Sequence, residues 1–306
     1  MIKIGTRGSK LALTQTRMLI NLMKISFPEV QFEEIVIKTL GDREQNVPLY
    51  KMGGRGLFIK EIEEALIGNE IDIAVHSLKD VPHQLPNGLC LGAVSSRVDP
   101  RDVMISNVQV SNISQIPNQF RIGTSSLRRR AQLKSVLPEI SFVDFRGNLD
   151  TRLRKLHEGN VDGLILAAAG LERLGIEEPH ILKFSVDEII PAAGQGLLAV
   201  ECRISDMDRL KPILGVVENS RGRAACEAER AFLAEIDSGC QAAIGCYSSF
   251  ESDFMIESIG FVSDPEGKKI LKNKKRFNVN DAKDGGKALA QDLISQGALD
   301  ILSGKL

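Results

Sequence analysis

The chain has 306 residues, more than one hydrophobic core usually serves, so we expect two or three domains. A net charge of -1 gives no overall field that attracts nucleic acid, and with two Tyr and no Trp an aromatic stacking platform for bases is poorly supplied. Five scattered cysteines, no secretory pattern at the N-terminus and no long apolar run together predict a reduced, cytoplasmic protein without a membrane span.

The first hundred residues alternate apolar strands with amphipathic helices. Ser9 is a typical N-cap for a helix that continues to about Ile25. The polar, glycine-rich stretch 41–56 predicts a mobile loop, a candidate lid. The remaining elements of this part are strands at 2–5, 31–39, 71–75 and 89–94 and a helix at about 57–67. This order predicts a parallel, helix-covered sheet.

The strand at 71–75 is followed by a cluster of polar side chains. Pro82 lacks a backbone N–H and pushes Val81 out of helical geometry, so the chain turns there. Ligands of open α/β sheets bind beyond the carboxyl ends of strands. The residues at this tip are His76, Ser77, Lys79 and Asp80. We interpret them as a candidate site, with an ordinary polar loop as the alternative.

A second lobe repeats the design after a crossover at residues 95–101. Ser125 is the expected N-cap of its first helix. Its elements are strands at 121–124, 141–145 and 163–167, helices at 126–136 and 148–157, and a short helix at 171–174. Residues 191–196 are a second hinge-like stretch, and 197–202 can return to the first lobe as a strand. Two lobes joined by two crossings predict a ligand cleft between them.

The last part of the chain has a different pattern. A helix at 221–236 precedes three antiparallel strands at about 244–250, 254–261 and 269–277, and a helix at 281–295 follows. This is an α+β domain. The loop at 237–243 carries Cys240 between Gly239 and Gln241, where the thiol is either reactive or incidental.

Arginines gather at the ends of elements in the two lobes. In the first turn of a helix an arginine opposes the helix dipole at a cost of some tenths of a kcal/mol, which an anionic ligand would offset. The arginines at strand or helix ends that we expect to bind an anion are Arg7, Arg128, Arg129, Arg146, Arg152 and Arg173. For Arg130, Arg154 and Lys134 we prefer a solvated helix face. A nucleic-acid site at residues 127–130 lacks aromatic partners and a basic surplus.

Seven motifs, in order along nearly the whole chain, resemble the porphobilinogen deaminase (hydroxymethylbilane synthase) family. They are residues 5–9 (GTRGS), 53–58 (GGRGLF), 76–82 (HSLKDVP), 123–129 (GTSSLRR), 146–148 (RGN), 194–196 (GQG) and 239–241 (GCQ). The chain departs from the family's commoner residues at Gly8, Lys10, Arg55 and Ala242–Ala243. Cys246 adds a second thiol close to Cys240 in sequence.

The resemblance implies head-to-tail condensation of four porphobilinogen units with loss of ammonia, followed by hydrolytic release of hydroxymethylbilane, a step of tetrapyrrole and haem biosynthesis. It also implies a dipyrromethane cofactor held by a thioether to Cys240. A carboxylate, here Asp80, would stabilise the cation left by ammonia or transfer protons. The alternative function is a non-catalytic, two-lobed anion-binding protein.

The resemblance further implies three domains: two α/β lobes like those of a periplasmic binding protein, with mostly parallel sheets, and an α+β domain with a three-stranded antiparallel sheet. We expect residues 1–96 with 195–214, 97–194 and 215–306. We also expect a monomer that acts on a small molecule and binds no metal, nucleic acid or membrane.

The same resemblance assigns the site residues. Cofactor-binding positions are Cys240, Lys79, Asp80, Ser125, Arg128, Arg129, Arg146 and Gly147. Substrate-binding positions are Arg7, Ser9, Phe58, Arg146, Arg152, Arg173 and Gln195, and Lys51 and Arg55 belong to the lid.

Overall fold

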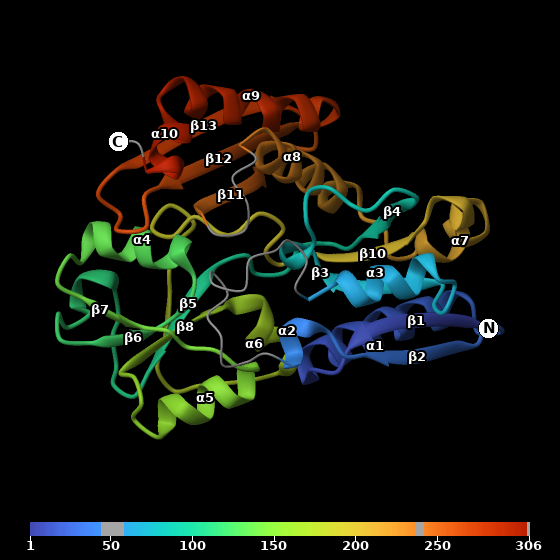
Figure 1. Cartoon of the computed structure of the whole chain (residues 1–306), viewed down its shortest axis with the longest axis horizontal. Coiled ribbons are helices and arrows are strands. Elements are labelled where there is room, and N and C mark those ends of the chain that lie inside the picture. The colour runs from blue at the N-terminus through green and yellow to red at the C-terminus, as the bar shows by residue number, and fades with distance from the viewer. Residues whose placement is uncertain (44–57, 237–241, 305–306) are drawn as a thin grey trace.

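Three sheets organise the chain in the computed structural model, which describes residues 1–43, 58–236 and 242–304 (Figure 1). Two are five-stranded and mixed, and the third is three-stranded and antiparallel. The predicted fold class is confirmed: two α/β lobes with mostly parallel sheets, in which only β10 and β5 run against the other strands, and a C-terminal α+β unit with a three-stranded antiparallel sheet. Within these residues no helix is both long and apolar enough to cross a membrane.

The first sheet has the strand order β2-β1-β3-β10-β4. Its strands are β1 (Ile2–Arg7), β2 (Phe32–Ile37), β3 (Ile73–Ser77), β4 (Leu89–Val94) and β10 (Leu198–Arg203). Its helices are α1 (Lys10–Ser26), α2 (Leu40–Arg43), α3 (Lys60–Ile67) and α7 (Met207–Leu214). Strand β1 runs parallel to β2 and β3, whereas β10 returns from far along the chain and pairs antiparallel with β3 and β4. The expected return of residues 197–202 is therefore confirmed.

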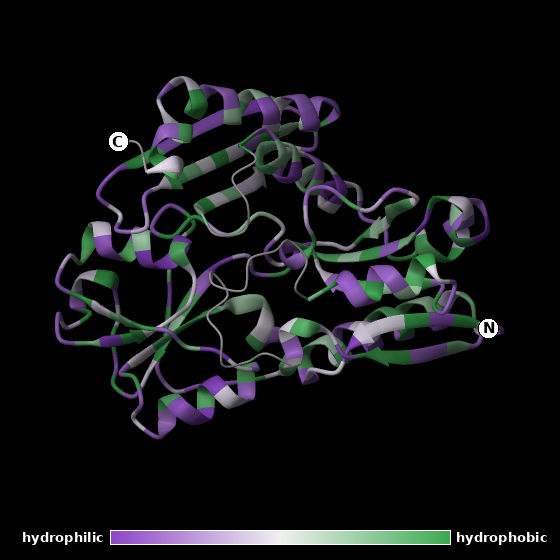
Figure 2. Ribbon diagram, in the orientation of Figure 1, coloured by the Kyte–Doolittle hydropathy of each residue, from purple (hydrophilic) through white to green (hydrophobic). Residues whose placement is uncertain are grey.

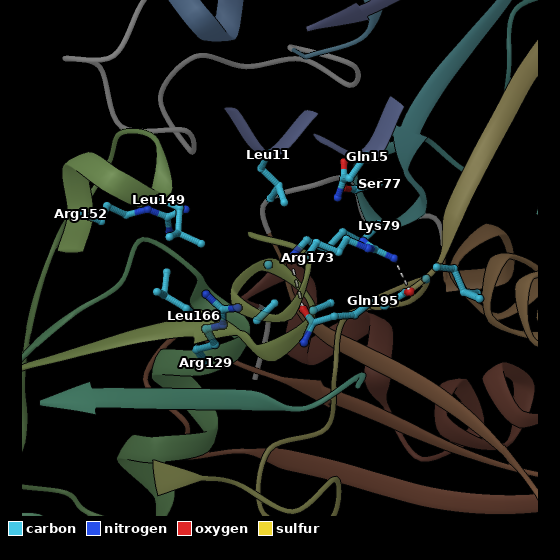
Figure 3. Close-up of a pocket in the computed structure, with 16 residues that line it drawn as sticks. Leu11, Gln15, Ser77, Lys79, Arg129, Leu149, Arg152, Leu166, Arg173 and Gln195 are labelled. Carbon is cyan, nitrogen blue, oxygen red and sulfur yellow. Dashed lines mark hydrogen bonds between the residues drawn. The ribbon is translucent and has the colours of Figure 1, made fainter. Parts of the chain in front are cut away.

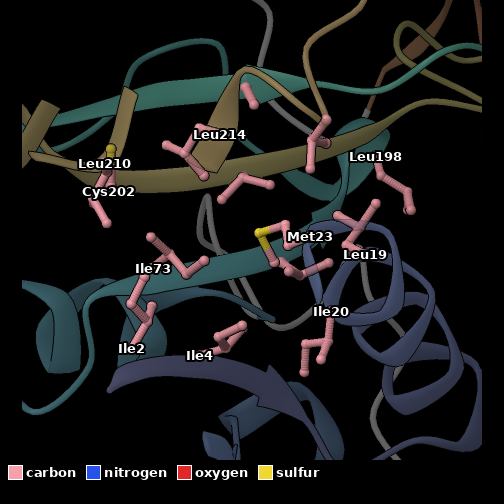
Figure 4. Close-up of a cluster of buried hydrophobic side chains, with 14 residues drawn as sticks. Ile2, Ile4, Leu19, Ile20, Met23, Ile73, Leu198, Cys202, Leu210 and Leu214 are labelled. Atoms are coloured by element: carbon pink, nitrogen blue, oxygen red, sulfur yellow. The ribbon is translucent and has the colours of Figure 1, made fainter. Parts of the chain in front are cut away.

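Helices cover both faces of this sheet. On one face Leu19 and Met23 of α1 and Leu210 of α7 pack on Ile73 and other alternate strand residues (Figure 4). On the other face α3 buries its apolar residues against Ala74 and its neighbours. The two covered faces fix the register of β3, because a slip of one residue would exchange them.

The second sheet has the order β7-β6-β8-β5-β9. Its strands are β5 (Asp102–Ser106), β6 (Arg121–Gly123), β7 (Ser141–Val143), β8 (Gly163–Ala167) and β9 (Ile181–Lys183), and its helices are α4 (Leu127–Val136), α5 (Leu149–His157) and α6 (Ala168–Leu174). Sequence analysis did not identify β5 or β9. Both pair antiparallel, β5 with β8 and β9 with β5, so β5 alone runs against the other four strands and the sheet is mostly parallel, as expected.

The predicted N-cap of α4 is wrong by one residue. Ser126 is the N-cap, and its Oγ accepts a hydrogen bond from the Arg129 amide at 3.4 Å. The hydroxyl of Ser125 is engaged elsewhere: it accepts from the Phe145 amide at 3.1 Å and lies 3.3 Å from the Phe145 carbonyl oxygen. Ser125 thus ties the loop after β6 to the loop after β7.

The third unit confirms the expected meander. Strands β11 (Ala243–Phe250), β12 (Met255–Ser263) and β13 (Ile270–Asn278) form its sheet, covered by α8 (Ser220–Ile236), α9 (Ala282–Ser295) and α10 (Ala298–Ser303). Helices such as α5 and α9 alternate hydrophilic and hydrophobic residues along the ribbon, as helices with one buried face do (Figure 2). The unit packs on α4 through a cluster that includes Ala131, Ile190 and Phe261.

Candidate functional site

A pocket opens where the first and second sheets meet (Figure 3). Residues of α1, β3, α4, α5, β8, α6 and the 194–197 segment contribute to it. Four of the lining residues are cationic: Lys79, Arg129, Arg152 and Arg173. Because they arrive from four separate elements, the positive charge of the pocket exists only in the folded chain.

Lys79 and Asp80 lie on a short 3₁₀ turn, Leu78–Asp80, directly after β3. The Leu78 amide donates to the Leu197 carbonyl oxygen at 3.0 Å, and the Val81 amide closes the turn on Leu78 at 3.0 Å. Both Lys79 and Asp80 are exposed. The Asp80 carboxylate nevertheless opposes the lowering of the pKa of Arg152 on α5, so its charge is felt across the pocket.

Gln195 joins the two sides of this site. Its side chain is 1% exposed. Its Oε1 accepts from Nζ of Lys79 at 3.4 Å, a weak contact drawn in Figure 3. Its Nε2 donates to the Pro100 carbonyl oxygen at 2.7 Å and to Oδ1 of Asp102 at 3.0 Å. The assigned residue Gln195 is therefore a buried connector, with only its Oε1 directed at the ammonium of the turn.

Asp102 is a central residue of the site that sequence analysis missed. It is fully buried at the start of β5. Arg128 Nη1 donates to its Oδ2 at 2.7 Å, and Arg129 donates to Oδ1 from Nη2 at 2.7 Å and from Nε at 3.1 Å. Although burial alone would raise the pKa of this carboxyl, the two guanidinium groups hold it well below its usual range. Asp102 is thus an anion that balances two buried cations.

The two arginines differ in what remains available. Arg128 is 5% exposed, donates to the Ile190 carbonyl oxygen at 2.6 Å as well as to Asp102, and does not line the pocket. Arg129 donates to the Ile165 carbonyl oxygen at 3.0 Å and does line it. Of these two assigned residues, Arg129 is the one placed to reach a ligand directly.

Arg152 and Arg173 are incompletely satisfied cations. The pKa of each is lowered to about 10, by burial at both residues and also by the charge of Arg129 at Arg152. The Nε atom of each is buried without a hydrogen-bond partner. Arg173 does donate to the Gly196 carbonyl oxygen at 2.7 Å. Buried donors without partners are costly, so an acceptor delivered by a ligand would be favoured here.

Lys79 is the third perturbed cation. Its side chain is exposed to the pocket, yet the surrounding walls shield it from bulk water, and this desolvation lowers its pKa to about 8. Asp80 and Asp102 oppose the shift, whereas Arg129 and Arg128 add to it. The pKa of Lys79 therefore depends more on how closely the pocket walls surround the side chain than on its solvent-accessible surface.

Arg7, Phe58 and Ser9 make local contacts outside this pocket. Arg7 donates to Asp42 from Nη2 at 2.5 Å and from Nε at 3.2 Å, and its guanidinium carbon lies 4.2 Å from the centre of the Phe58 ring. Ser9 is the N-cap of α1, as predicted, and accepts from the Ala12 amide at 3.3 Å. These three assigned residues do not line the pocket in the described part of the chain.

The segment after β7 carries Arg146 and Gly147. Burial lowers the pKa of Arg146, and Asp144 opposes that shift. Gly147 has a φ of +119°, and a Cβ there would lie 3.1 Å from Cγ2 of Thr151. Position 147, directly before the N-cap of α5, therefore favours glycine for both conformational and steric reasons.

The three residues for which we preferred a solvated face behave differently from one another. Arg154 is exposed and pairs with Glu158 at 2.8 Å, as expected. Arg130 is 20% exposed at its side chain and donates to the Thr124 carbonyl oxygen at 2.7 Å, so it closes the β6–α4 turn instead. Lys134 contacts Glu266 in the turn between β12 and β13.

Three assigned residues, Lys51, Arg55 and Cys240, lie outside the described residues. The competing thiol, Cys246, is described. It is 0% exposed on β11, and burial raises its pKa well above the usual value. A buried, protonated thiol is a poor nucleophile, so Cys246 is not suited to carry a ligand.

Comparison with known proteins finds similar chains over almost the whole length. Residues 2–211 match the family model described as porphobilinogen deaminase, dipyromethane cofactor binding domain, and residues 223–295 match the porphobilinogen deaminase C-terminal domain. The porphobilinogen deaminase of Brevibacillus brevis is 46% identical over 301 residues, covering 98% of this chain and 96% of the relative. That of Bacillus subtilis is 44% identical over 302 residues, covering 98% and 95%.

Solved structures show a more remote likeness. The periplasmic aliphatic sulphonate binding protein SsuA of Escherichia coli has 12% identity and a TM-score of 0.40 and covers 76% of this chain and 69% of its own. A substrate binding protein of an amino acid ABC transporter has 13% identity and a TM-score of 0.38, covering 74% and 95%. The near full-length matches to curated relatives and to both family models are the ones that assign the chain, and it belongs to the porphobilinogen deaminase family.

Proposed function

We propose that the chain is a hydroxymethylbilane synthase, a transferase that condenses four porphobilinogen units head to tail and releases hydroxymethylbilane. The observation that carries this proposal is the pocket lined by Lys79, Arg129, Arg152 and Arg173, with Asp80 on the adjoining turn. Each porphobilinogen bears an acetate and a propionate. A growing chain of such rings therefore needs several fixed cations, which this pocket supplies in a protein of net charge -1.

The residues present fit a dipyrromethane cofactor, whose acidic side chains match the donors of the pocket. The unpartnered Nε atoms of Arg152 and Arg173 and the Nζ of Lys79 are available to carboxylates. Arg129 would hold a further carboxylate from α4, and Ser125 and Arg146 would contribute from the adjoining loops. When bound, the cofactor supplies a pyrrole carbon as the nucleophile that begins the chain.

The role proposed for Asp80 follows from the charges that develop. The C–N bond of the aminomethyl group breaks, ammonia leaves with its electron pair, and a cation conjugated with the pyrrole ring remains. The Asp80 carboxylate stabilises that cation, a contribution of about 3–4 kcal/mol for one preorganised group. After the new carbon–carbon bond forms, the attacked ring carbon loses a proton, which Asp80 accepts. Release would need cleavage of the bond between the cofactor's ring carbon and the methylene carbon of the first unit. Asp80 would return a proton to that ring carbon and accept the one lost when water adds to the methylene carbon, which gives the hydroxymethyl group.

Cys240 is the proposed attachment point. The other cysteines, Cys90, Cys202, Cys226 and Cys246, are half-buried or buried, and desolvation raises the pKa of each. High pKa values keep these thiols protonated and unreactive. Only Cys240, in its Gly-Cys-Gln setting, is left among the five as a candidate for a thioether.

We further propose a cytoplasmic monomer that binds no nucleic acid, built of residues 1–96 with 195–214, 97–194 and 215–306. The absence of a basic surplus in the composition supports the statement on nucleic acid. The separate hydrophobic clusters of the three sheets support the division.

Two measurements test the proposal together. Peptide mapping with intact mass should find a dipyrromethane adduct on Cys240, and it should persist in Cys246→Ala. Purified protein should release one ammonia for each porphobilinogen consumed, and Asp80→Asn should nearly abolish that release without unfolding the protein. Tight binding of porphobilinogen without ammonia release would instead identify a non-catalytic anion-binding protein. A bare polypeptide mass, from cells that make porphobilinogen, would contradict the cofactor assignment.

A further inference from the structure

Three ionisable side chains are buried together behind the Lys79–Asp80 turn. They are His76 on β3, Glu201 on β10 and Glu63 on α3, with relative exposures of 5%, 0% and 8%. Nε2 of His76 lies 3.2 Å from Oε2 of Glu201. Burial, together with the charges of Glu201 and of Glu64 on the same helix, raises the pKa of Glu63 to about 7. None of the three lines the pocket.

Their polar atoms are left without conventional partners. Both carboxylate oxygens of Glu201, Nε2 of His76 and Oε1 of Glu63 are buried with no satisfactory hydrogen bond. All four lie where α3 covers one face of the first sheet, since α3 packs on Ala74, which shares that face with His76 and Glu201. They require an explanation, because each would cost about 1–3 kcal/mol if it stayed unsatisfied. Shared protons provide one. A proton held on Glu63 and one on Nε2 of His76 would both be donated to the carboxylate oxygens of Glu201.

We propose that Glu63, His76 and Glu201 form one proton-sharing cluster that fixes the end of β3, so that all three act as positioning residues for Lys79 and Asp80. In this state His76 donates Nε2–H to Glu201, and the acidic hydrogen of Glu63 supplies a second donor to the same buried carboxylate. Ionising Glu63 would remove that donor and place a further negative charge inside the protein.

The position of His76 explains why a contact there controls the turn. Strand β3 pairs with β1 at Ile73 and Ala74. Beyond Ala74 its ladder partner is β10, with His76 opposite Ala199 and Ser77 opposite Leu198. His76 and Glu201 are diagonal neighbours on the same face of that ladder. The contact between His76 and Glu201 therefore holds the end of β3, directly before the turn with Lys79 and Asp80, against β10.

The cluster also links the turn to α3 and α8. The guanidinium of Arg230 on α8 donates to the carbonyl oxygens of Val81 at 3.3 Å and His83 at 2.9 Å. The charge of Glu201 stabilises that guanidinium. The other titratable groups that sense Glu201 are Cys90 of β4 and Cys202 of β10, whose thiols stay protonated. Within the described chain, Arg230 is thus the cation outside the cluster that senses the charge of Glu201.

This inference rests on the proposed function for its activity readout, so its main test is independent of turnover. Glu63→Gln keeps the size of the side chain and a hydrogen-bond donor but cannot ionise. Glu70→Gln removes an exposed charge just after the same helix and serves as the control. Hydrogen exchange of a peptide spanning β3 and the turn, corrected for intrinsic rates, is measured between pH 5 and 8 by mass spectrometry.

The native cluster holds the Glu63 proton more tightly than an opened chain does, so opening becomes easier as pH rises toward 7. In the wild type and Glu70→Gln, the opening equilibrium should increase by up to about tenfold per pH unit and level off above 7. In Glu63→Gln the dependence should be lost. Identical pH dependence in Glu63→Gln and the wild type would overturn the proposal.

Two further readouts complete the test. Glu201→Gln removes the central acceptor, so the β3 peptide should lose protection at every pH; unchanged protection in this variant would also overturn the cluster. In ammonia release, the wild type should lose rate above pH 7 relative to Glu63→Gln. If no variant turns over porphobilinogen while the exchange results hold, the proposed function fails and the cluster stands.

Discussion

Oδ1 of Asp102 lies 2.7 Å from Nη2 of Arg129, a buried ion pair between the first residue of β5 and the first turn of α4. The same carboxylate accepts from Arg128 and Gln195. The anion therefore orients the pocket-facing guanidinium and, through Gln195, the ammonium of Lys79. It also resolves the puzzle of adjacent arginines at a helix N-terminus, because their charge is balanced inside the protein.

Replacing Asp102 by Asn should leave two buried guanidinium groups without their counter-ion. We expect a loss of about 3–5 kcal/mol in the free energy of unfolding, measured by denaturant titration. The matched control is Asp162→Asn, which breaks a similar pair with Arg121 at 3.0 Å on the surface and should cost about 1 kcal/mol or less. Equal losses in the two variants would contradict the role assigned to Asp102.

Arg152 and Arg154 lie two residues apart on α5 but face different surroundings. Arg152→Gln removes a desolvated cation whose Nε has no partner, so the ligand-free protein should gain on the order of 1 kcal/mol of stability. The same change should raise KM for porphobilinogen roughly 10- to 100-fold, because a charge-assisted hydrogen bond is worth about 1.5–3 kcal/mol.

Arg154→Gln, which breaks an exposed pair with Glu158, should change neither quantity appreciably. Steady-state kinetics and thermal unfolding of the two variants, side by side, decide the matter. An Arg152→Gln protein that is both less stable and fully active would show that this arginine has a structural role only.

Sequence patterns predicted the positions of the arginines better than their partners. Arg152 and Arg173 were recognisable because they follow strand ends, and strand ends converge at one edge of a sheet. The pairing of Asp102 with Arg129 joins residues far apart in sequence and depends on β5 entering the middle of the second sheet. The crossover interpretation of residues 95–101 hid that strand, since β5 begins at the next residue.

The sequence also could not show which of two similar neighbouring residues takes a given structural role. Ser125 and Ser126 are both good N-caps, and the structure selects Ser126 because Ser125 contacts the backbone of Phe145. Likewise Gln195 and Arg128 carry no pattern that distinguishes a buried connector from a ligand-contacting residue. The only sequence signal for Asp102 was an acidic residue at the start of a strand, and this signal does not indicate which cation pairs with it.

The pKa of about 8 at Lys79 predicts a pH dependence of substrate binding. Below pH 8 the ammonium is charged and attracts carboxylates; above pH 8 it loses its proton and that attraction. KM for porphobilinogen should therefore rise as pH passes 8. Lys79→Arg keeps the charge, so the rise should move toward pH 10, where Arg152 and Arg173 begin to titrate.

Lys60→Arg, at an exposed position on α3, is the matched control and should retain the wild-type profile. The measurement is KM from pH 6.5 to 10. If KM of Lys79→Arg still rises as pH passes 8, the rise is caused by the titration of a group other than Lys79.

Two glycines with positive φ separate backbone strain from crowding at the Leu78–Asp80 turn. A Cβ at Gly194 (φ 76°) would lie 2.8 Å from Cγ of Leu78 and 3.0 Å from the Lys79 nitrogen, whereas at Gly88 (φ 89°) it would meet nothing within 4 Å. Both alanine variants should lose about 1–2 kcal/mol of stability from the left-handed conformation. Only Gly194→Ala should also displace the turn that carries Asp80, so its kcat should fall at least tenfold while that of Gly88→Ala stays near the wild-type value. Stability measured by denaturant titration and kcat from ammonia release separate the two effects, and a Gly194→Ala enzyme with normal kcat would mean that the 194–196 segment does not hold the turn in place.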